Sequence, residues 1–490
     1  MQHIRFDFNN MLSDNIGLAN GITEYELKKI KGLAASAHNH LAQLASDEQN
    51  RRNLGLEWIR LPFQDKSLLK DIQQLGEEIS KNFSSVIFLG IGGSYLGLKA
   101  AQDALLPCYY NEFATLRKGA PRFYFEGKNL DPDTLDVLLK NLNPKETFVV
   151  VISKSGETTE TKAAFCVVEK WLKKGAGKRY GRQVAVITDP KSGSLRKRVI
   201  MEQMKDVLSF RSLPLIEGVG GRFSELNMGL LHLAIAGVDI EDLLCGASTM
   251  AKRCSNPDLF KNPALMYAAI NNILYHRKGK SIAILMPFSE ALKSTADWYC
   301  QLLAESLGKK YSRKIKVSSQ GKESWELDTK KIINVGRTPV SACGTADLHS
   351  IHQNNVEGEN NKVITFIRVE KFKSEFNLSG TGDFLSGRSF SYLLKLAQEA
   401  TEWALVKESR PNCSIIMPEV TPYYWGGLIF FFEMATAYEG ELLNINAFNQ
   451  PGVEGYKNYM YFKLDKPGIS AKVANEIKSR PLVKKEKFII

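Results

Sequence analysis

Short, almost continuous apolar runs recur along this chain and alternate with longer segments of helical period. Because these runs lack the apolar–polar alternation of a half-exposed strand, they predict strands that are buried on both faces. Strands of this kind belong to parallel sheets whose two faces are covered by helices. The predicted strands span residues 85–89, 122–125, 147–153, 184–188, 281–287 and 363–369.

The segments between these strands carry helix signals. In residues 263–276, Met266, Ala269 and Ile273 share one face, and Pro263 suits the first turn. Strands separated by such helices predict an α/β fold of doubly wound domains, with mainly parallel sheets and flanking helices.

The strand–helix pattern occurs twice, and the glycine-rich sequence EGVGG at 217–221 lies between the two occurrences. A chain of 490 residues is also too long for one simple core. We therefore expect two α/β domains with additional helical segments. The expected segments are an N-terminal helical region at 1–82, a first α/β domain at 83–216, connecting helices at 217–258, a second α/β domain at 259–446, and a C-terminal loop and helical tail at 447–490.

Charge, cysteine content and hydropathy restrict the class of function. The net charge of +12 favours acidic ligands such as phosphates, but no nucleic-acid-binding motif is present, so we expect no nucleic-acid partner. The seven cysteines form no Cys-x-x-Cys pair, which is typical of a reducing compartment. The most apolar run, 423–432, has half of the ~20 residues that a membrane helix needs. We expect a cytoplasmic protein that has no membrane partner.

The first predicted strand runs directly into the glycine-rich turn GIGGS at 90–94. Such a turn between a strand and a helix lets backbone N–H groups converge on an anion. The spacing differs from the dinucleotide-binding motif, and no acidic residue closes a following strand at the expected place. A phosphate site and a plain tight turn are both compatible with this segment alone.

The third predicted strand ends in SKSGETTE at 153–160, where four residues carry hydroxyl groups. Short hydroxyl donors suit the oxygens of a phosphate monoester, and a Ser/Thr cap on the following helix is the structural alternative. Two such loops at the carboxyl ends of strands favour phosphate binding, because open α/β sheets bind ligands at that edge.

Further segments place acid–base side chains near glycines. Arg222 follows Gly221, where a fixed cation could stabilise an oxyanion, and an ion pair with a surface acid is the structural alternative. Gln301 and Glu305 are four residues apart in a predicted helix and therefore share a face. The structural alternative for Glu305 is an exposed ion pair with Lys309.

Two more segments contribute candidates. His349 and His352 could bind a metal as an (i, i+3) pair, but no third ligand is evident, so no metal site is predicted. Lys457 follows the loop at 448–456.

Taken together, these segments resemble the glucose-6-phosphate isomerase family. The resemblance extends over nearly the whole chain, and the six motifs occur in the same order as in the family. The last of the six motifs is the most specific, and the short glycine loops are the least specific. The motifs are LGIGGSYLG at 89–97, SKSGETTET at 153–161, GVGGRFS at 218–224, QLLAESLGK at 301–309, GTADLHS at 344–350 and FNQPGVEGYK at 448–457.

The resemblance implies two SIS-type α/β domains and a cytoplasmic homodimer with shared active sites. It implies reversible isomerisation of glucose 6-phosphate and fructose 6-phosphate through a cis-enediol, in glycolysis and gluconeogenesis, with no cofactor and no metal. The implied catalytic residues are Glu305, His349, Lys457 and Arg222. The implied substrate-binding residues are Gly93, Ser94, Ser153, Lys154, Ser155, Thr158, Gly221 and Gln301.

Two alternatives stay open: a related isomerase that also accepts mannose 6-phosphate, and a non-catalytic SIS-type module that binds a sugar phosphate. The chain also departs from the family pattern at three positions. Glu225 and Asn227 stand where small or apolar residues are usual, and Asn449 replaces an aspartate. We expect these departures to change local packing after Ser224 and around the 448–457 motif, not the reaction.

Overall fold

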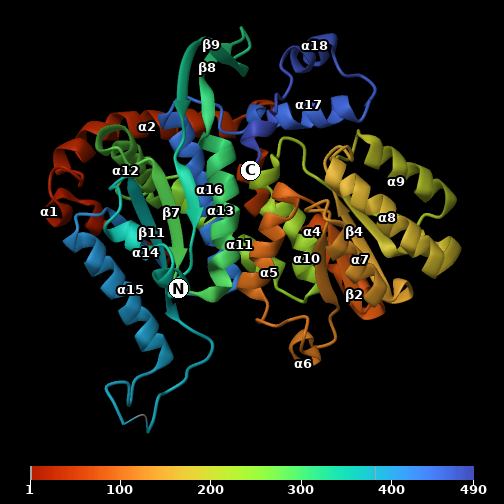
Figure 1. The fold of residues 1–490 in the computed structure, drawn as a ribbon, viewed down its shortest axis with the longest axis horizontal. Coiled ribbons are helices and arrows are strands. Elements are labelled where there is room, and N and C mark those ends of the chain that lie inside the picture. Colours follow the sequence, from red (N-terminus) through yellow and green to blue (C-terminus); the bar gives the residue numbers. More distant parts are fainter. Residues whose placement is uncertain (1–2, 381) are drawn as a thin grey trace.

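The computed structural model describes residues 3–380 and 382–490, which form two lobes, each built around a five-stranded sheet. In Figure 1 the first sheet lies in the orange and yellow lobe, and the second lies in the green and blue lobe. The predicted fold class is confirmed, since all but one of the strand pairs in these two sheets are parallel.

The first sheet has the order β3-β2-β4-β5-β6. Its strands are β2 (Ser85–Leu89), β3 (Arg122–Glu126), β4 (Thr147–Ile152), β5 (Val184–Thr188) and β6 (Arg211–Pro214). β2, β4 and β5 are buried along their whole length, as their apolar sequences predict. The chain places β3 and β4 on opposite sides of β2, and open α/β sheets bind ligands outside the carboxyl ends of strands at such a point.

The second sheet has the order β1-β12-β11-β7-β10, and its four parallel strands repeat the arrangement of the first sheet. Its strands are β1 (Arg5–Asp7), β7 (Ile282–Pro287), β10 (Thr338–Ser341), β11 (Lys362–Lys371) and β12 (Asn412–Glu419). β1 comes from the N-terminal region and pairs antiparallel with β12. The pairing of β1 with β12 attaches the first residues of the chain to the second sheet. The division of the chain into the five segments expected from the sequence stays a proposal.

All six predicted strands are present, as β2, β3, β4, β5, β7 and β11. The unpredicted strands are short, as in β1, β6 and β10, or begin with polar residues, as in β12. The other two form a long hairpin of β8 (Lys309–Val317) and β9 (Glu323–Val335), which projects from the molecule and is mostly exposed (Figure 1). Exposed strands lack the continuous apolar run that marks a buried one.

Helices surround both sheets and fill the space between the lobes. Those of the first half are α1 (Ser13–Ile16), α2 (Glu24–Ser46), α3 (Glu48–Leu54), α4 (Lys66–Asn82), α5 (Leu96–Leu105), α6 (Ala114–Arg117), α7 (Pro132–Asn141), α8 (Thr159–Ala176), α9 (Ser194–Lys205), α10 (Glu225–Ile235) and α11 (Ile240–Cys254). Those of the second half are α12 (Pro263–Lys278), α13 (Lys293–Leu307), α14 (His352–Val356), α15 (Phe390–Lys407), α16 (Pro422–Leu442), α17 (Glu454–Lys463) and α18 (Ala471–Ser479).

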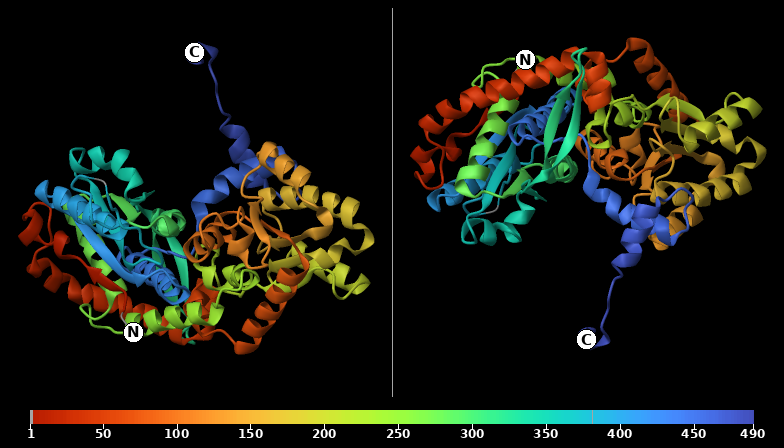
Figure 2. Two further views of the ribbon diagram at one scale, coloured as in Figure 1. Left: turned by 90° about the horizontal axis from the view of Figure 1, so that it is seen from below. Right: turned by 90° about the horizontal axis from the view of Figure 1, so that it is seen from above.

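Helix α16 contains the most apolar run of the sequence and is buried on every side, against α11, α12 and α2. Within the described ranges, no helix combines the length and apolar character needed to cross a membrane. Helix α17 lies over the first lobe, and the residues after α18 extend away from both lobes (Figure 2).

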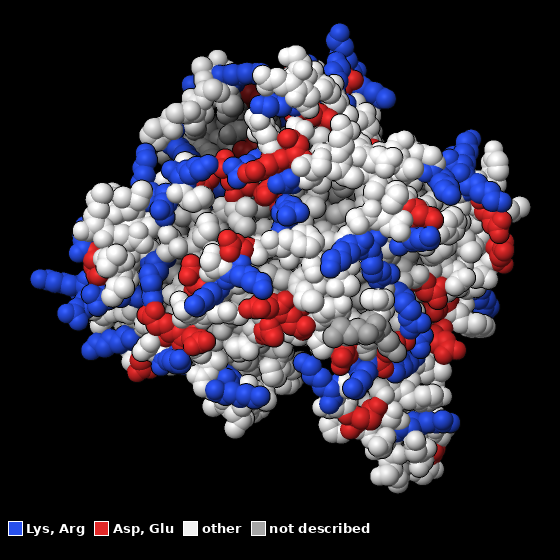
Figure 3. All heavy atoms as spheres, turned by 180° about the vertical axis from the view of Figure 1, so that it is seen from behind, with Lys and Arg blue, Asp and Glu red and all other residues white. Residues whose placement is uncertain are grey.

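Charged side chains of both signs cover the surface. On the face drawn in Figure 3, lysine and arginine side chains intermix with aspartate and glutamate, and no broad field of one sign covers this face. On this face the positive side chains are therefore interspersed with negative ones and form no basic stripe.

Candidate active site

Two glycine-rich turns meet at the carboxyl end of β2. The 3-10 turn Gly92–Ser94 contacts the 3-10 turn Gly221–Phe223. A Cβ atom at Gly93 would lie 2.1 Å from the carbonyl oxygen of Gly221, so only glycine allows this approach. The structure thus brings the predicted residues Gly93 and Gly221 into direct contact.

The loop after β4 presents hydroxyl groups at the same edge of the sheet. Ser153 is buried and its Oγ accepts the N–H of Gly156 at 3.1 Å, while the Oγ of exposed Ser155 accepts the N–H of Glu157 at 3.1 Å. Each hydroxyl keeps its own O–H as a donor. Thr158 occupies the N-cap position of α8, but its side chain makes no capping hydrogen bond. The helix-cap alternative is therefore not realised at Thr158.

Lys154 and Ser94 flank this arrangement. Lys154 is exposed, and its carbonyl oxygen accepts the N–H of Asp189. The Ser94 hydroxyl donates to the sulfur of Met228 at 3.8 Å. Both residues belong to the loops that follow β2 and β4, as the motif positions predict.

Arg222 is a fixed, buried cation with an exposed fraction of 2%. Each of its five N–H donors has an acceptor, which holds the guanidinium in one orientation. The acceptors are Ser306 Oγ at 2.8 Å, Glu305 Oε2 at 3.3 Å, Gln450 Oε1 at 3.1 Å, Ala447 O at 2.6 Å and Asn449 O at 3.0 Å. Burial lowers the pKa of Arg222 to about 10, and the Glu305 carboxylate acts in the opposite direction.

Glu305 lies in the last turn of α13, and both of its carboxylate oxygens accept hydrogen bonds. Gln301 Nε2 donates to Oε1 at 3.0 Å, so the predicted shared face of Gln301 and Glu305 is confirmed. Arg222 Nη1 donates to Oε2 at 3.3 Å. The side chain remains 29% exposed, so a ligand can reach the carboxylate.

The alternative of an exposed Glu305–Lys309 ion pair is wrong. Lys309 is 6% exposed, and its Nζ donates to the carbonyl oxygen of Glu305, not to the carboxylate. The same Nζ donates to the carbonyl oxygen of Asn449 at 2.8 Å. Sequence reasoning missed this lysine as a site residue, because main-chain acceptors leave no mark in a sequence.

Lys457 lies in the first turn of α17, where its Nζ forms an ion pair with Glu454 at 3.0 Å. Partial burial lowers the pKa of Lys457, but the bond to Glu454 outweighs it, so the pKa lies above its ordinary value. Helix α17 contacts the loop after β4 through the Tyr461 hydroxyl, which donates to the carbonyl oxygen of Glu157 at 3.3 Å. Lys457 is thus carried by a helix that lies against this loop.

His349 lies in the lobe of the second sheet. It ends the 3-10 turn Ala346–His349, which follows β10, and its side chain is exposed. Among the described residues, no hydrogen bond or ion pair joins it to Arg222, Glu305 or Lys457. The contacts within one chain therefore link Arg222, Gln301 and Glu305, but not His349.

The two departures after Ser224 point into the core. Glu225 is buried so tightly that a Cβ atom at Gly97 would lie 2.2 Å from its Cγ. Asn227 accepts the N–H of Ile216 at 3.3 Å through its Oδ1. The third departure, Asn449, serves Arg222 and Lys309 through its carbonyl oxygen.

Two cavities border these residues. One of about 610 Å³ lies beside Lys309 and includes Gly308, Pro451 and Gly452 in its lining. Another of about 580 Å³ lies between α8 and α17, with Glu157 and Thr159 in its wall. In the described parts of the chain, no group of three or more His, Cys, Asp or Glu side chains is arranged to hold a metal ion.

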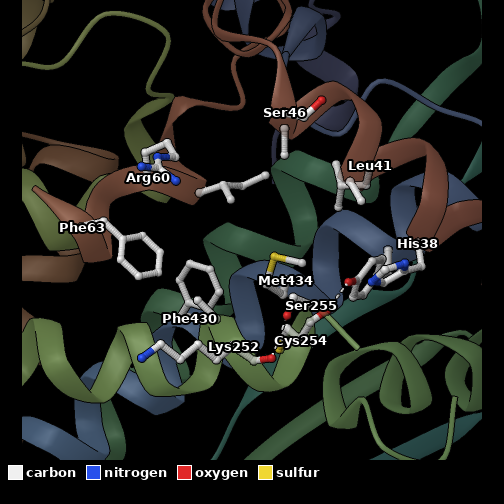
Figure 4. A pocket seen from close by; sticks show the side chains of 15 residues that line it. His38, Leu41, Ser46, Arg60, Phe63, Lys252, Cys254, Ser255, Phe430 and Met434 are labelled. Carbon is white, nitrogen blue, oxygen red and sulfur yellow. Dashed lines mark hydrogen bonds between the residues drawn. The ribbon is translucent and has the colours of Figure 1, made fainter. Parts of the chain in front are cut away.

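A third cavity, of about 360 Å³, is separate from the predicted site. It is mostly apolar and lies among α2, α11 and α16, with Leu41, Phe430 and Met434 in its wall and Arg60 and Lys252 beside them (Figure 4). None of the predicted site residues lines it.

Known proteins are similar to this chain in sequence over most of its length. The family model described as Phosphoglucose isomerase matches residues 66–479. The glucose-6-phosphate isomerase of Carboxydothermus hydrogenoformans is 37% identical over 495 residues, which cover 99% of this chain and 99% of that protein. The glucose-6-phosphate isomerase of Symbiobacterium thermophilum is 37% identical over 431 residues, which cover 86% of this chain and 89% of that protein.

Solved structures share the fold. A hypothetical protein from Thermus thermophilus has a TM-score of 0.78 at 31% identity, covering 94% of this chain and 99% of that chain. A glucose-6-phosphate isomerase from Chlamydia trachomatis has a TM-score of 0.71 at 22% identity, covering 92% of this chain and 88% of that chain. The matched span and the near-complete coverage of the relatives lead to one conclusion: the chain belongs to the phosphoglucose isomerase family.

Proposed function

We propose that this protein interconverts glucose 6-phosphate and fructose 6-phosphate, as part of glycolysis and gluconeogenesis. The observation that carries the proposal is the Glu305 carboxylate, held by Gln301 and Arg222 on a helix that contacts the glycine-rich turns Gly92–Ser94 and Gly221–Phe223. The family relatives named glucose-6-phosphate isomerase support the same reaction.

The reaction begins with ring opening, in which His349 donates a proton to the ring oxygen and Lys457 assists in the same region. The bond between the ring oxygen and carbon 1 breaks, and the hydroxyl at carbon 1 loses its proton to solvent and becomes the aldehyde. Glu305 then removes the proton from carbon 2, and the electrons of that C–H bond form the C1–C2 double bond while the carbonyl oxygen at carbon 1 becomes negative. General base catalysis of this kind contributes about 10²–10⁴-fold. Protonation of that oxygen gives the cis-enediol.

The return step completes the isomerisation. Glu305 gives its proton to carbon 1, and the hydroxyl oxygen at carbon 2 loses its proton and becomes the ketone. Arg222 stabilises the negative charge of the enediolate, and its five hydrogen bonds mean that little reorganisation is needed. Because a base and a fixed cation suffice for this transfer, we expect activity in the presence of a chelator.

The substrate's phosphate is assigned to the loops after β2 and β4. Ser153, Ser155 and Thr158 have O–H donors for phosphate oxygens, and Lys154 adds a positive charge. The backbone of Gly93 and Ser94 borders the same edge of the sheet. Holding the phosphate in these loops orients the rest of the substrate for reaction.

We also propose a homodimer in which His349 completes the site of the partner subunit. Two observations support it: His349 is exposed, and it lies outside the hydrogen bonds that join Arg222, Gln301 and Glu305. Large apolar side chains are exposed in the same lobe, at Phe376, Phe384, Phe390 and Trp403. A cavity of about 400 Å³ connects part of this apolar region to Thr345, in the loop that carries His349.

We also propose that the protein is located in the cytoplasm. All seven cysteines are free thiols, and Cys108, Cys166 and Cys245 are exposed. Exposed free thiols are typical of a reducing compartment.

The test is a coupled assay with purified protein, fructose 6-phosphate and a strong chelator, in which glucose 6-phosphate is detected by its oxidation with a dehydrogenase. Product formation supports the proposal. Binding of 6-phosphogluconate without product would favour the non-catalytic module, and a comparable rate with mannose 6-phosphate would favour the broader isomerase.

A further inference from the structure

Lys309 is a buried basic residue beside the candidate base Glu305, and it has no role in the proposed mechanism. It is the first residue of β8, two positions after α13 ends at Leu307. Among the described residues it has two acceptors, both main-chain carbonyl oxygens, of Glu305 and Asn449. A buried ammonium needs such partners, because it loses its hydration.

The first acceptor lies in the last turn of α13. Carbonyl groups there lack an intrahelical N–H partner, and a cation near this end of a helix is favourable. The carbonyl oxygen of Ala304 receives the N–H of Gly308 at 3.0 Å, whereas that of Glu305 receives the Lys309 ammonium. Lys309 therefore fixes the turn that carries the candidate base.

The second acceptor connects the two cations of the site. The carbonyl oxygen of Asn449 accepts from Lys309 at 2.8 Å and from Arg222 at 3.0 Å. Arg222 in turn donates to the Glu305 carboxylate. The contacts close a ring that runs from the Glu305 side chain through Arg222, the Asn449 carbonyl and Lys309 to the Glu305 main chain.

We propose that Lys309 is a positioning residue of the active site, which ties the Glu305-bearing end of α13 to the Asn449 loop so that Glu305 and Arg222 keep their mutual orientation. This inference rests on the proposed isomerase function. Lys309 acts through Glu305 and Arg222 and does not itself exchange a proton with the substrate.

The charge balance of the ring supports this role. The ring holds two basic side chains, Lys309 and Arg222, and one carboxylate, that of Glu305, so with Lys309 protonated it carries an excess positive charge that an enediolate would offset. Burial, followed by the charge of Arg222, lowers the pKa of Lys309 to about 7. Burial and the charge of Arg222 both disfavour the protonated form of Lys309. A general contribution to fold stability is therefore a poor explanation for a lysine at this position.

The test compares Lys309→Met, which keeps the length of the side chain and removes the ammonium, with Lys309→Arg, which keeps a cation and N–H donors. We expect Lys309→Met to lower kcat by about 100-fold, because a small displacement of the base is enough for such a loss. Its KM and its affinity for 6-phosphogluconate should stay within about threefold of the original values. Lys309→Arg should recover kcat to within about tenfold of the original.

Lys316→Met is the matched control, because Lys316 lies on the same strand but is 60% exposed. It should leave kcat unchanged. The inference is overturned if Lys309→Met retains full kcat, or if Lys309→Arg is as impaired as Lys309→Met. If Lys309→Met does not fold, Lys309→Gln takes its place, since it keeps an N–H donor without the charge.

The same experiment separates this inference from the proposed function. An inactive original protein would contradict the isomerase function. An active original protein with unaffected Lys309 variants would contradict only the role of Lys309.

Discussion

At the residue scale, the proposed function depends most on the Glu305 carboxylate. Glu305→Gln keeps the shape and removes the base, so we expect kcat to fall by about 10²–10⁴-fold, while 6-phosphogluconate binds nearly as before. Steady-state kinetics and calorimetry measure the two quantities. Glu326→Gln, on the exposed hairpin, is the control and should remain active. Unchanged exchange of the carbon-2 proton with deuterated solvent in Glu305→Gln would exclude Glu305 as the base.

The phosphate loop offers a second test at this scale. Thr158→Val together with Ser153→Ala removes two O–H donors, and each lost bond to a charged acceptor should weaken binding by roughly 1.5–3 kcal/mol. Thr158→Ser keeps its donor and serves as the matched control. Affinity for 6-phosphogluconate is the measurement, and circular dichroism checks the fold. Equal affinity in all variants would place the phosphate elsewhere.

At the element scale, helices α10 and α16 meet at two buried carboxyl groups, Glu225 and Glu433. Burial raises the pKa of Glu225 to about 8, and burial together with the charge of Glu225 raises the pKa of Glu433. No lysine or arginine forms an ion pair with either group in the part of the chain that the structure describes. The fold therefore holds protons there that an unfolded chain would release.

This arrangement predicts that stability falls as the pH rises from the acidic range through neutrality to about 8. Because the folded-state pKa is raised, the native state binds more protons than the unfolded state, and the free energy of unfolding falls as the pH rises toward about 8. Glu225→Gln should reduce the fall of Tm between about pH 5 and about pH 8. Scanning calorimetry at several pH values gives the slopes. Parallel slopes for Glu225→Gln and the original protein would contradict the prediction, and Glu326→Gln should keep the original slope.

At the scale of the whole molecule, the proposed dimer predicts complementation between inactive variants. Glu305→Gln and His349→Ala proteins are unfolded together and refolded as mixed dimers. With shared sites, one site of a mixed dimer receives both substitutions and the other receives neither, so roughly a quarter of all sites should recover under random pairing. Activity per site after separate and joint refolding is the measurement. If mixed dimers form and no activity returns, each site is built within a single chain.

The sequence predicted much of the fold because a strand that is buried on both faces has a continuous apolar run in its own sequence. The apolar runs of β2, β4 and β5 are continuous, and the structure buries each of them completely. Strand β1 and the β8–β9 hairpin have no continuous apolar run, because β1 consists of three residues and the hairpin is mostly exposed. The motifs likewise indicated the family, since they combine glycine turns with reactive side chains in a fixed order.

The tertiary structure alone decided how the candidate site is held together. Arg222 reaches carbonyl oxygens of Ala447 and Asn449, more than 200 positions away, and Lys309 reaches the same Asn449 carbonyl. Every residue carries a carbonyl group, so no sequence pattern shows which one becomes an acceptor. Local sequence alone was enough to predict the buried strands, the turn glycines and the reactive residue types. Which of those residues share hydrogen bonds depended on the packing of distant segments, because only the fold brings them within reach.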